Sequence, residues 1–143
     1  MFIGTYHHSI DSRNRISVPK RFREKLGEKA VLTRGLDGCL FLYAKGDWER
    51  MEAILTQTPL TRQDARSFAR LMLSGAVIVE IDKIGRILVP GYLKEYAKLK
   101  NEVAVLGVGE RIEIWSQEQW ETYQIKLEQD SDAIAERLSE LGI

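Results

Sequence analysis

The 143-residue chain has one cysteine, few prolines and no long hydrophobic run. With Cys39 alone, an internal disulfide bond and a cysteine-rich zinc site are both excluded. Because Cys39 lies in an apolar stretch, we expect a buried and unreactive thiol. No apolar run approaches the roughly 20 residues that a membrane-spanning helix needs, and the N-terminus lacks the basic-then-apolar layout of a signal peptide. These absences predict a cytoplasmic protein without a membrane partner.

The chain also lacks net charge, with 21 basic and 21 acidic residues, but the two signs are unevenly distributed. Residues 1–34 contain eight basic and three acidic side chains, a net charge of +5. Residues 110–143 contain three basic and nine acidic ones, a net charge of −6. A basic front and an acidic tail suit a protein that binds a polyanion on one side. Two solvated faces without a partner would give the same distribution, so charge alone leaves both readings open.

Motifs of enzymatic catalysis are missing as well. The chain has no phosphate-binding loop, no nucleophile elbow and no metal-ligand spacing. The candidate catalytic groups are His7, His8, Asp11 and Asp82. Adjacent histidines on a strand point to opposite faces and cannot jointly chelate a metal in the usual way, so we expect structural or hydrogen-bonding roles for both. The sequence therefore predicts no enzyme, catalytic residue, cofactor, metal site or small-molecule substrate.

What the chain does contain is an internal repeat. Residues 10–19, Ile-Asp-Ser-Arg-Asn-Arg-Ile-Ser-Val-Pro, return as residues 81–90, Ile-Asp-Lys-Ile-Gly-Arg-Ile-Leu-Val-Pro, at a constant offset of 71 residues. Self-similarity at a fixed offset indicates one structural plan used twice. We expect a first repeat at residues 1–58, a connecting helix at 59–74, and a second repeat with the C-terminal helices at 75–143.

Each copy of the motif is typical of a strand, a tight polar loop, a second strand and the start of a helix. Asn14 and Gly85 occupy the same slot, and both residue types tolerate a left-handed backbone. Asp11 and Asp82 begin the loops, where a carboxylate can accept hydrogen bonds from backbone N–H groups a few residues on. We therefore expect these four residues to shape the loops. The arginine that closes each loop can point back at the aspartate or outward to a ligand.

The same order of elements follows in each half: β-loop-β-α-β-β-α. The expected strands are 2–10, 16–18, 30–34, 39–43, 76–81, 87–89, 103–106 and 111–115, and the expected helices are 19–26, 46–55, 61–73, 91–99, one that follows Ser116, and 132–141. Capping boxes are predicted at Thr61 with Asp64 and at Ser116 with Gln119.

Strands this few and this short cannot bury both faces of a half-domain alone. The predicted fold is therefore α+β, with the two halves joined in one small β-barrel and the helices outside, because closure removes exposed strand edges. Trp48, Trp120 and Tyr123 lie on the predicted outer helices. Their positions suit packing between subunits or an ordinary intramolecular core.

The repeated Asp-x-x-x-Arg loops and the opening Met-Phe-Ile-Gly-Thr-Tyr-His-His of residues 1–8 resemble the bacterial MraZ family, over essentially the whole chain. The positions that carry the resemblance are Gly4, Tyr6, His8, Asp11, Arg15, Pro19, Phe22 and Arg23 in the first half, and Asp82, Gly85, Arg86, Pro90 and residues 93–97 in the second. The resemblance implies a tandem AbrB-like (SpoVT-AbrB type) β-barrel and assembly into closed homo-oligomeric rings. It also implies a nucleoid-associated, sequence-specific DNA-binding protein. Such a protein regulates transcription of the division and cell-wall gene cluster and binds repeated boxes in double-stranded DNA upstream of its own operon.

By the same resemblance, the DNA-contacting loops are residues 11–15 and 82–86. Arginine is the best bidentate partner for guanine, and basic side chains on the adjoining helix can neutralise phosphates. The candidate DNA-binding residues are Arg13, Arg15, Lys20, Arg21, Arg23, Lys83 and Arg86, and the candidate loop-structuring residues are Asp11, Asn14, Asp82 and Gly85. Where the family usually has Lys-Gly in the first loop, this chain has Arg13-Asn14, which keeps the charge and the backbone freedom. A single chain offers few such cations, so several copies on repeated boxes would supply the affinity.

The alternative is a ring-forming scaffold that binds other proteins through its aromatic-rich helices, without direct base readout. DNA binding predicts an affinity that falls steeply with salt and is lost when Arg15 or Arg86 is replaced by alanine. A scaffold would keep its partner through those substitutions.

Overall fold

The computed structural model describes the whole chain, Met1–Ile143. Its elements are β1 (Phe2–Ser9), β2 (Arg15–Ser17), α1 (Lys20–Leu26), β3 (Lys29–Arg34), β4 (Leu40–Ala44), α2 (Lys45–Thr56), α3 (Gln63–Ser74), β5 (Val77–Glu80), β6 (Arg86–Leu88), α4 (Gly91–Tyr96), β7 (Glu102–Gly109), β8 (Arg111–Ser116), α5 (Gln117–Gln129), α6 (Ser131–Leu138) and the 3₁₀ turn η1 (Ser139–Leu141). The order of elements expected from the repeat is present in both halves. None of the six helices is long and apolar enough to cross a membrane.

The eight strands form two antiparallel sheets. Six of them pair in the order β1-β7-β8-β4-β3-β5, and β2 pairs with β6 in a separate ribbon. Strands of the two halves are interleaved: β1 pairs with β7 along its whole length, β4 with β8, and β3 with β5. The two halves therefore share one sheet and one core rather than folding side by side.

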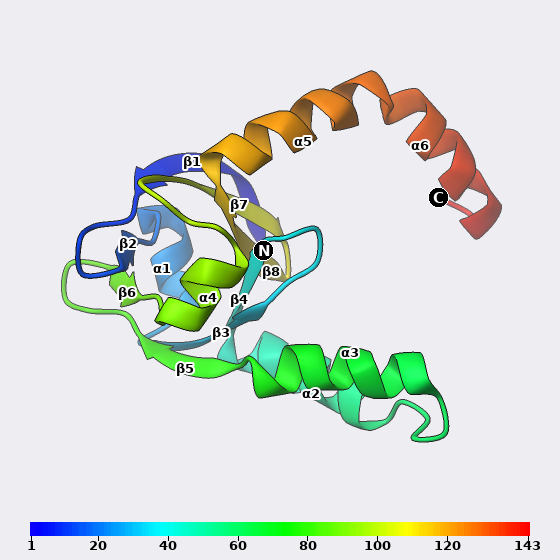
Figure 1. Cartoon of the computed structure of the whole chain (residues 1–143), viewed down its shortest axis with the longest axis horizontal. Coiled ribbons are helices and arrows are strands. Elements are labelled where there is room, and N and C mark those ends of the chain that lie inside the picture. The colour runs from blue at the N-terminus through cyan, green and yellow to red at the C-terminus, as the bar shows by residue number, and fades with distance from the viewer.

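The edges of the large sheet are β1 and β5, which do not pair with each other. The β2-β6 ribbon connects to both edges: Ile10, just after β1, bridges to Ile16 in β2, and β5 leads through its loop into β6 (Figure 1). The hydrogen bonding describes an open sheet completed by a ribbon. The α+β class and the antiparallel sheet are confirmed, whereas a closed barrel is not seen.

Two hydrophobic clusters cover opposite faces of the large sheet. Successive residues of a strand point to opposite sides, and on β3 Leu32 joins the larger cluster while Val31 joins the smaller. The larger cluster is closed by the ribbon, α1 and α4, and the smaller by α2, α3 and α5. Trp48 and Trp120 are each only 8% exposed and belong to the smaller cluster. Of the two roles expected for these tryptophans, the structure supports the intramolecular core.

The two predicted capping boxes have different outcomes. Ser116 Oγ accepts a hydrogen bond from Gln119 N at 3.4 Å, so the cap of α5 is confirmed. The box at Thr61 is wrong, because α3 begins after Arg62 and has no side-chain cap. The Asp64 carboxylate is instead held by the Arg62 guanidinium, at 3.2 Å from Nε and 2.9 Å from Nη2. The ion pair between Arg62, the N-cap residue, and Asp64 in the first turn therefore engages the carboxylate that the predicted capping box needs.

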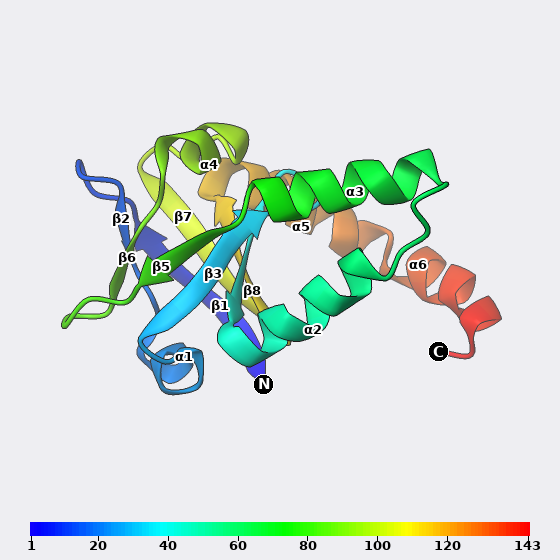
Figure 2. The same ribbon diagram turned by 90° about the horizontal axis from the view of Figure 1, so that it is seen from below.

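The molecule has two distinct ends. The α2–α3 hairpin and the α5–α6 arm project from one end, and the loops on either side of the β2-β6 ribbon project from the other (Figures 1 and 2). Helix α6 packs mainly against α5 and η1 rather than against the sheet. The repeated motif and the helical arms therefore face away from each other.

Candidate functional site

The two repeated loops lie at the ribbon end of the molecule, one on either side of the ribbon (Figure 2). The ribbon between them pairs Ile16 with Ile87 at its centre. Beyond the ribbon, Val18 N donates to Gly85 O and Val89 N donates to Asn14 O, each at 2.8 Å. Exchanging the two halves leaves this pattern unchanged, so both loops are held by equivalent bonds to the opposite half.

An aspartate holds each loop together. Asp11 Oδ1 accepts from the backbone N–H groups of Arg13 and Arg15, both at 2.9 Å. In the second loop, Asp82 Oδ1 accepts from the backbone N–H of Arg86 at 2.8 Å and from that of Ile84 at 3.1 Å. Hydrogen bonds to the ionised form lower the pKa of a carboxyl group. The backbone N–H of the closing arginine is the largest cause that holds the pKa of each aspartate below its usual value.

Each closing arginine is tied to its own aspartate by one nitrogen. Arg15 Nε donates to Asp11 Oδ2 at 3.0 Å, and Arg86 Nε donates to Asp82 Oδ2 at 2.9 Å. The arginine side chains are 28% and 27% exposed, so neither is enclosed by the core. Their Nη groups make no other hydrogen bond within the chain. The sequence left two directions for each arginine, toward its aspartate or outward to a ligand. In the structure, the Nε atom binds the aspartate and the Nη groups remain available to a ligand.

Both loops use the left-handed backbone expected at their shared slot. Asn14 has φ 61° and Gly85 has φ 85°. Lys94 Nζ, on α4, donates to Asn14 Oδ1 at 2.9 Å. Arg23 of α1 lies at the equivalent place against Gly85, where an added Cβ would stand 2.0 Å from Arg23 Cζ. Arg23 Nε also donates to Val18 O at 2.8 Å.

The cation on each helix thus contacts the loop of the opposite half. The sequence groups Arg23 with the phosphate-facing cations of its helix and gives no local reason to select Lys94. The missed signal is the repeat itself, because Lys94 follows Arg23 by the same 71 residues that relate Gly85 to Asn14. Arg23 is half-buried and already bonded, so its surroundings differ from those of its basic neighbours.

The remaining candidate cations are free at the surface. Arg13, Lys20, Arg21 and Lys83 are all exposed, and no side-chain hydrogen bond or ion pair restrains them. Lys83 also lines a polar hollow of about 570 Å³ beside the second loop. The loops and the adjoining helix therefore carry two restrained guanidinium groups and four exposed cations.

The other titratable groups that the sequence singled out are two neighbouring histidines and the cysteine. His7 Nδ1 is 2.8 Å from Gln117 Oε1, whereas His8 is half-buried and burial is the main cause that lowers its pKa. Burial also raises the pKa of the Cys39 thiol well above its usual value, which confirms an inert cysteine. No group of three or more His, Cys, Asp or Glu side chains is arranged to hold a metal ion.

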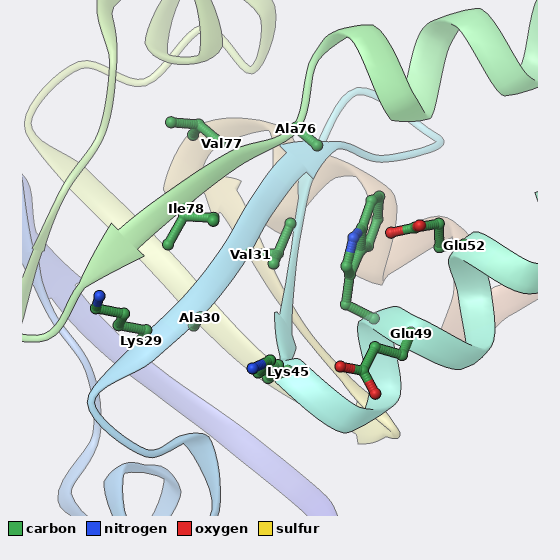
Figure 3. Close-up of a pocket in the computed structure, with 10 residues that line it drawn as sticks. Lys29, Ala30, Val31, Lys45, Glu49, Glu52, Ala76, Val77 and Ile78 are labelled. Atoms are coloured by element: carbon green, nitrogen blue, oxygen red, sulfur yellow. The ribbon is translucent and has the colours of Figure 1, made fainter.

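A separate groove of about 460 Å³ lies between β3, edge strand β5 and the start of α2 (Figure 3). Apolar side chains such as Val31 and Val77 line its floor, and Lys29 and Lys45 are balanced by Glu49 and Glu52 at its rim. Its mixed charge distinguishes it from the basic loop surface.

Interleaved halves, one shared antiparallel sheet and a pair of arginine-bearing loops define a tandem-repeat α+β protein with a basic loop surface. The chain belongs to the MraZ family. The family described as "MraZ protein, putative antitoxin-like" matches it twice, over residues 1–71 and 72–141. The resemblance inferred from the loops is thereby confirmed.

Proteins named transcriptional regulator MraZ are similar to this chain over its full length. The chain is 50% identical to the protein of Thermoanaerobacter sp. (strain X514), 52% to that of Alkaliphilus metalliredigens (strain QYMF) and 51% to that of Clostridium acetobutylicum. Each comparison extends over 143 residues and covers 100% of both chains. The name of these relatives describes a regulator, which is not a class of enzyme.

Proposed function

We propose that the chain is a sequence-specific DNA-binding transcriptional regulator that reads double-stranded DNA with loops 11–15 and 82–86. One observation carries the proposal: the same aspartate-held arginine, with a free Nη edge, occurs twice at one end of the molecule. Relatives about half identical to the chain are named transcriptional regulators, which supports the same function.

The loop geometry suits base readout. The two Nη groups of a guanidinium match the O6 and N7 acceptors of guanine in the major groove. Because Asp11 and Asp82 already hold the Nε atoms of Arg15 and Arg86, little side-chain freedom is lost on binding. Around them, the exposed cations contact phosphates, which gives affinity without sequence information. These phosphate contacts are assigned to Arg13, Lys20, Arg21 and Lys83.

The finer architecture is part of the same proposal. We assign an AbrB-like (SpoVT-AbrB type) arrangement to the repeats, with 1–58 as the first, 59–74 as the connecting segment that contains α3, and 75–143 as the second. The family resemblance further supports repeated boxes upstream of the protein's own operon, in the division and cell-wall gene cluster, and a place on the nucleoid.

Surface area supports self-association. The chain exposes 9229 Å², whereas a compact monomer of 16.4 kDa exposes about 7,500 Å². The excess of about 1,700 Å² is twice the ~800 Å² that each partner contributes to a standard protein–protein interface, as expected for a chain that contacts two neighbours. The projecting helices and the segments that join and follow them expose large apolar side chains, namely Ile54, Leu60, Ile125 and Leu141. We therefore propose that further copies of the chain cover the helical arms in a homo-oligomeric ring.

A ring also explains how loops with few cations bind tightly. Linking several copies converts each later binding event into an intramolecular one, which raises affinity by orders of magnitude without a new contact. The loops face away from the arms (Figure 1), so copies joined through their arms leave their loop surfaces open to repeated DNA boxes.

The test is fluorescence anisotropy with a duplex from the protein's own upstream region and a scrambled duplex. Each of Arg15→Ala and Arg86→Ala is expected to weaken specific binding by about 10- to 100-fold. Lys98→Met, at an exposed lysine that belongs neither to the loops nor to the projecting helices, is the control and should bind as the wild type does. Particle mass, measured by light scattering, should stay that of the wild type in all three variants.

The rival scaffold function predicts a different result. A scaffold without base readout would keep its partner after either loop substitution, and its affinity for the two duplexes would be equal. Unchanged promoter binding by both loop variants would therefore reject DNA recognition by these loops.

A further inference from the structure

Each loop is braced by a helix of the opposite half, immediately before the arginine that closes the loop. Lys94 holds the Asn14 side chain, and Arg15 is the next residue. Arg23 lies against Gly85, and Arg86 is the next residue. The bracing contacts therefore act on the residue directly before each closing arginine, which fixes the position of that arginine's backbone.

The two braces are chemically matched to the residues that they hold. Asn14 offers a side-chain oxygen, and the point-like ammonium of Lys94 donates to it. Gly85 has no side chain, and the flat guanidinium of Arg23 fills the space that a Cβ would need. Arg23 is itself anchored by its bond to Val18 O, and Val18 N donates to Gly85 O. Each cation therefore matches the residue that it holds.

We infer that Lys94 and Arg23 are positioning residues for DNA recognition, each directing the base-reading arginine of the opposite half. The inference rests on the proposed function of the loops. Each cation is half-buried and already bonded to, or packed against, the opposite loop, so we assign it to positioning the loop rather than to a phosphate contact. A consequence is that one half cannot present a competent loop without the other.

The test compares Lys94→Met with Lys98→Met, an exposed lysine just beyond the same helix. Lys94→Met is expected to lower affinity for the specific duplex about tenfold, as for the loss of a hydrogen bond to a charged group. The dependence of affinity on salt should not change, whereas losing a phosphate contact would lower the slope by about 0.9. Lys98→Met should leave specific affinity unchanged.

Substitutions at the braced residue separate positioning from other roles. In an Asn14→Gly background, Lys94→Met should cost nothing further, because the bond it removes is already absent. The double variant Asn14→Gly with Lys94→Arg recreates the second-loop pairing in the first loop, and it should restore specific affinity to within about threefold of the wild type.

The outcomes distinguish this inference from the proposed function. Specific binding by the wild type together with an unaffected Lys94→Met variant would overturn the positioning role alone. A reduced salt slope, or an undiminished effect in the Asn14→Gly background, would also overturn it by showing a direct phosphate contact. Failure of the wild type to prefer the specific duplex would reject the proposed function itself.

Discussion

Replacing Gly85 by alanine tests how tightly the second loop and helix α1 are joined. The substitution has two structural costs. Gly85 has φ 85°, and a left-handed backbone costs an L-residue about 1–2 kcal/mol. The new Cβ would also stand 2.0 Å from Arg23 Cζ, so the Arg23 side chain must move and give up its bond to Val18 O. Such a bond to a charged group contributes about 1.5–3 kcal/mol, and we take the lower end because Arg23 is half-exposed.

The expected loss is therefore about 3 kcal/mol of unfolding free energy, or roughly 6–12 °C in Tm for a chain of this size. Gly109→Ala is the matched control, since Gly109 has φ 75° and an added Cβ there would meet nothing within 4 Å. It should cost only the backbone component, about 1–2 kcal/mol. Urea titration followed by circular dichroism measures both values.

An Arg23→Ala background isolates the contact. With Arg23 truncated, Gly85→Ala should cost no more than Gly109→Ala does. If Gly85→Ala and Gly109→Ala are equally destabilising in the otherwise wild-type chain, Arg23 does not brace the loop as described.

Three further predictions concern the sheet, one histidine and the loop aspartates. An alanine Cβ at Gly107 would stand 2.3 Å from Ile3 N, a backbone atom that cannot move aside. Gly107→Ala should therefore separate β1 from β7 and lower the free energy of unfolding by at least about 3 kcal/mol in the same urea titration. A loss of unfolding free energy below about 1 kcal/mol would contradict the pairing. Burial lowers the pKa of His8 below its ordinary 6.5, so the unfolded chain binds the proton more readily. The His8 contribution to the free energy of unfolding is complete above about pH 6.5 and declines as the pH falls below it. His8→Gln should therefore flatten the dependence of unfolding free energy on pH between pH 7 and 5. The same slope in both proteins would refute the lowered pKa of His8. Asp11→Asn and Asp82→Asn each remove a negative charge near DNA, yet both should weaken specific binding at least fivefold because they release the arginine; tighter binding in anisotropy would show that the aspartates only repel phosphate.

The sequence predicted the strands, helices and loops well because each depends on residues close together in the chain. Residues alternating or recurring every three to four positions placed the strands and helices, and the polar slot shared by Asn14 and Gly85 indicated the left-handed loops that the structure has. The repeat indicated a single plan used twice, which the two family matches agree with. The failed cap at Thr61 shows the limit of such patterns, since the nearby Arg62 competes for the same carboxylate.

Contacts between the halves could not be read from the sequence in the same way. Nothing local specifies that β1 pairs with β7 rather than with a strand of its own half. The brace from Lys94 to Asn14 joins residues 80 positions apart, and a lysine on an amphipathic helix is ordinarily solvated. Likewise, the loop motif alone did not decide whether the Arg15 guanidinium faced its aspartate or solvent. In the structure, Nε binds the aspartate, whereas the Nη groups bind no other group of the chain.

The most direct test of the account is binding to a duplex in which 7-deazaguanine replaces single guanines of the upstream boxes, which removes the N7 acceptor and little else. If Arg15 and Arg86 read guanine through their free Nη edges, replacement at a contacted guanine should lower wild-type affinity about tenfold. The variant that lacks the arginine reading that guanine should show no further loss. Wild-type binding that is indifferent to every such replacement would contradict guanine readout by these loops.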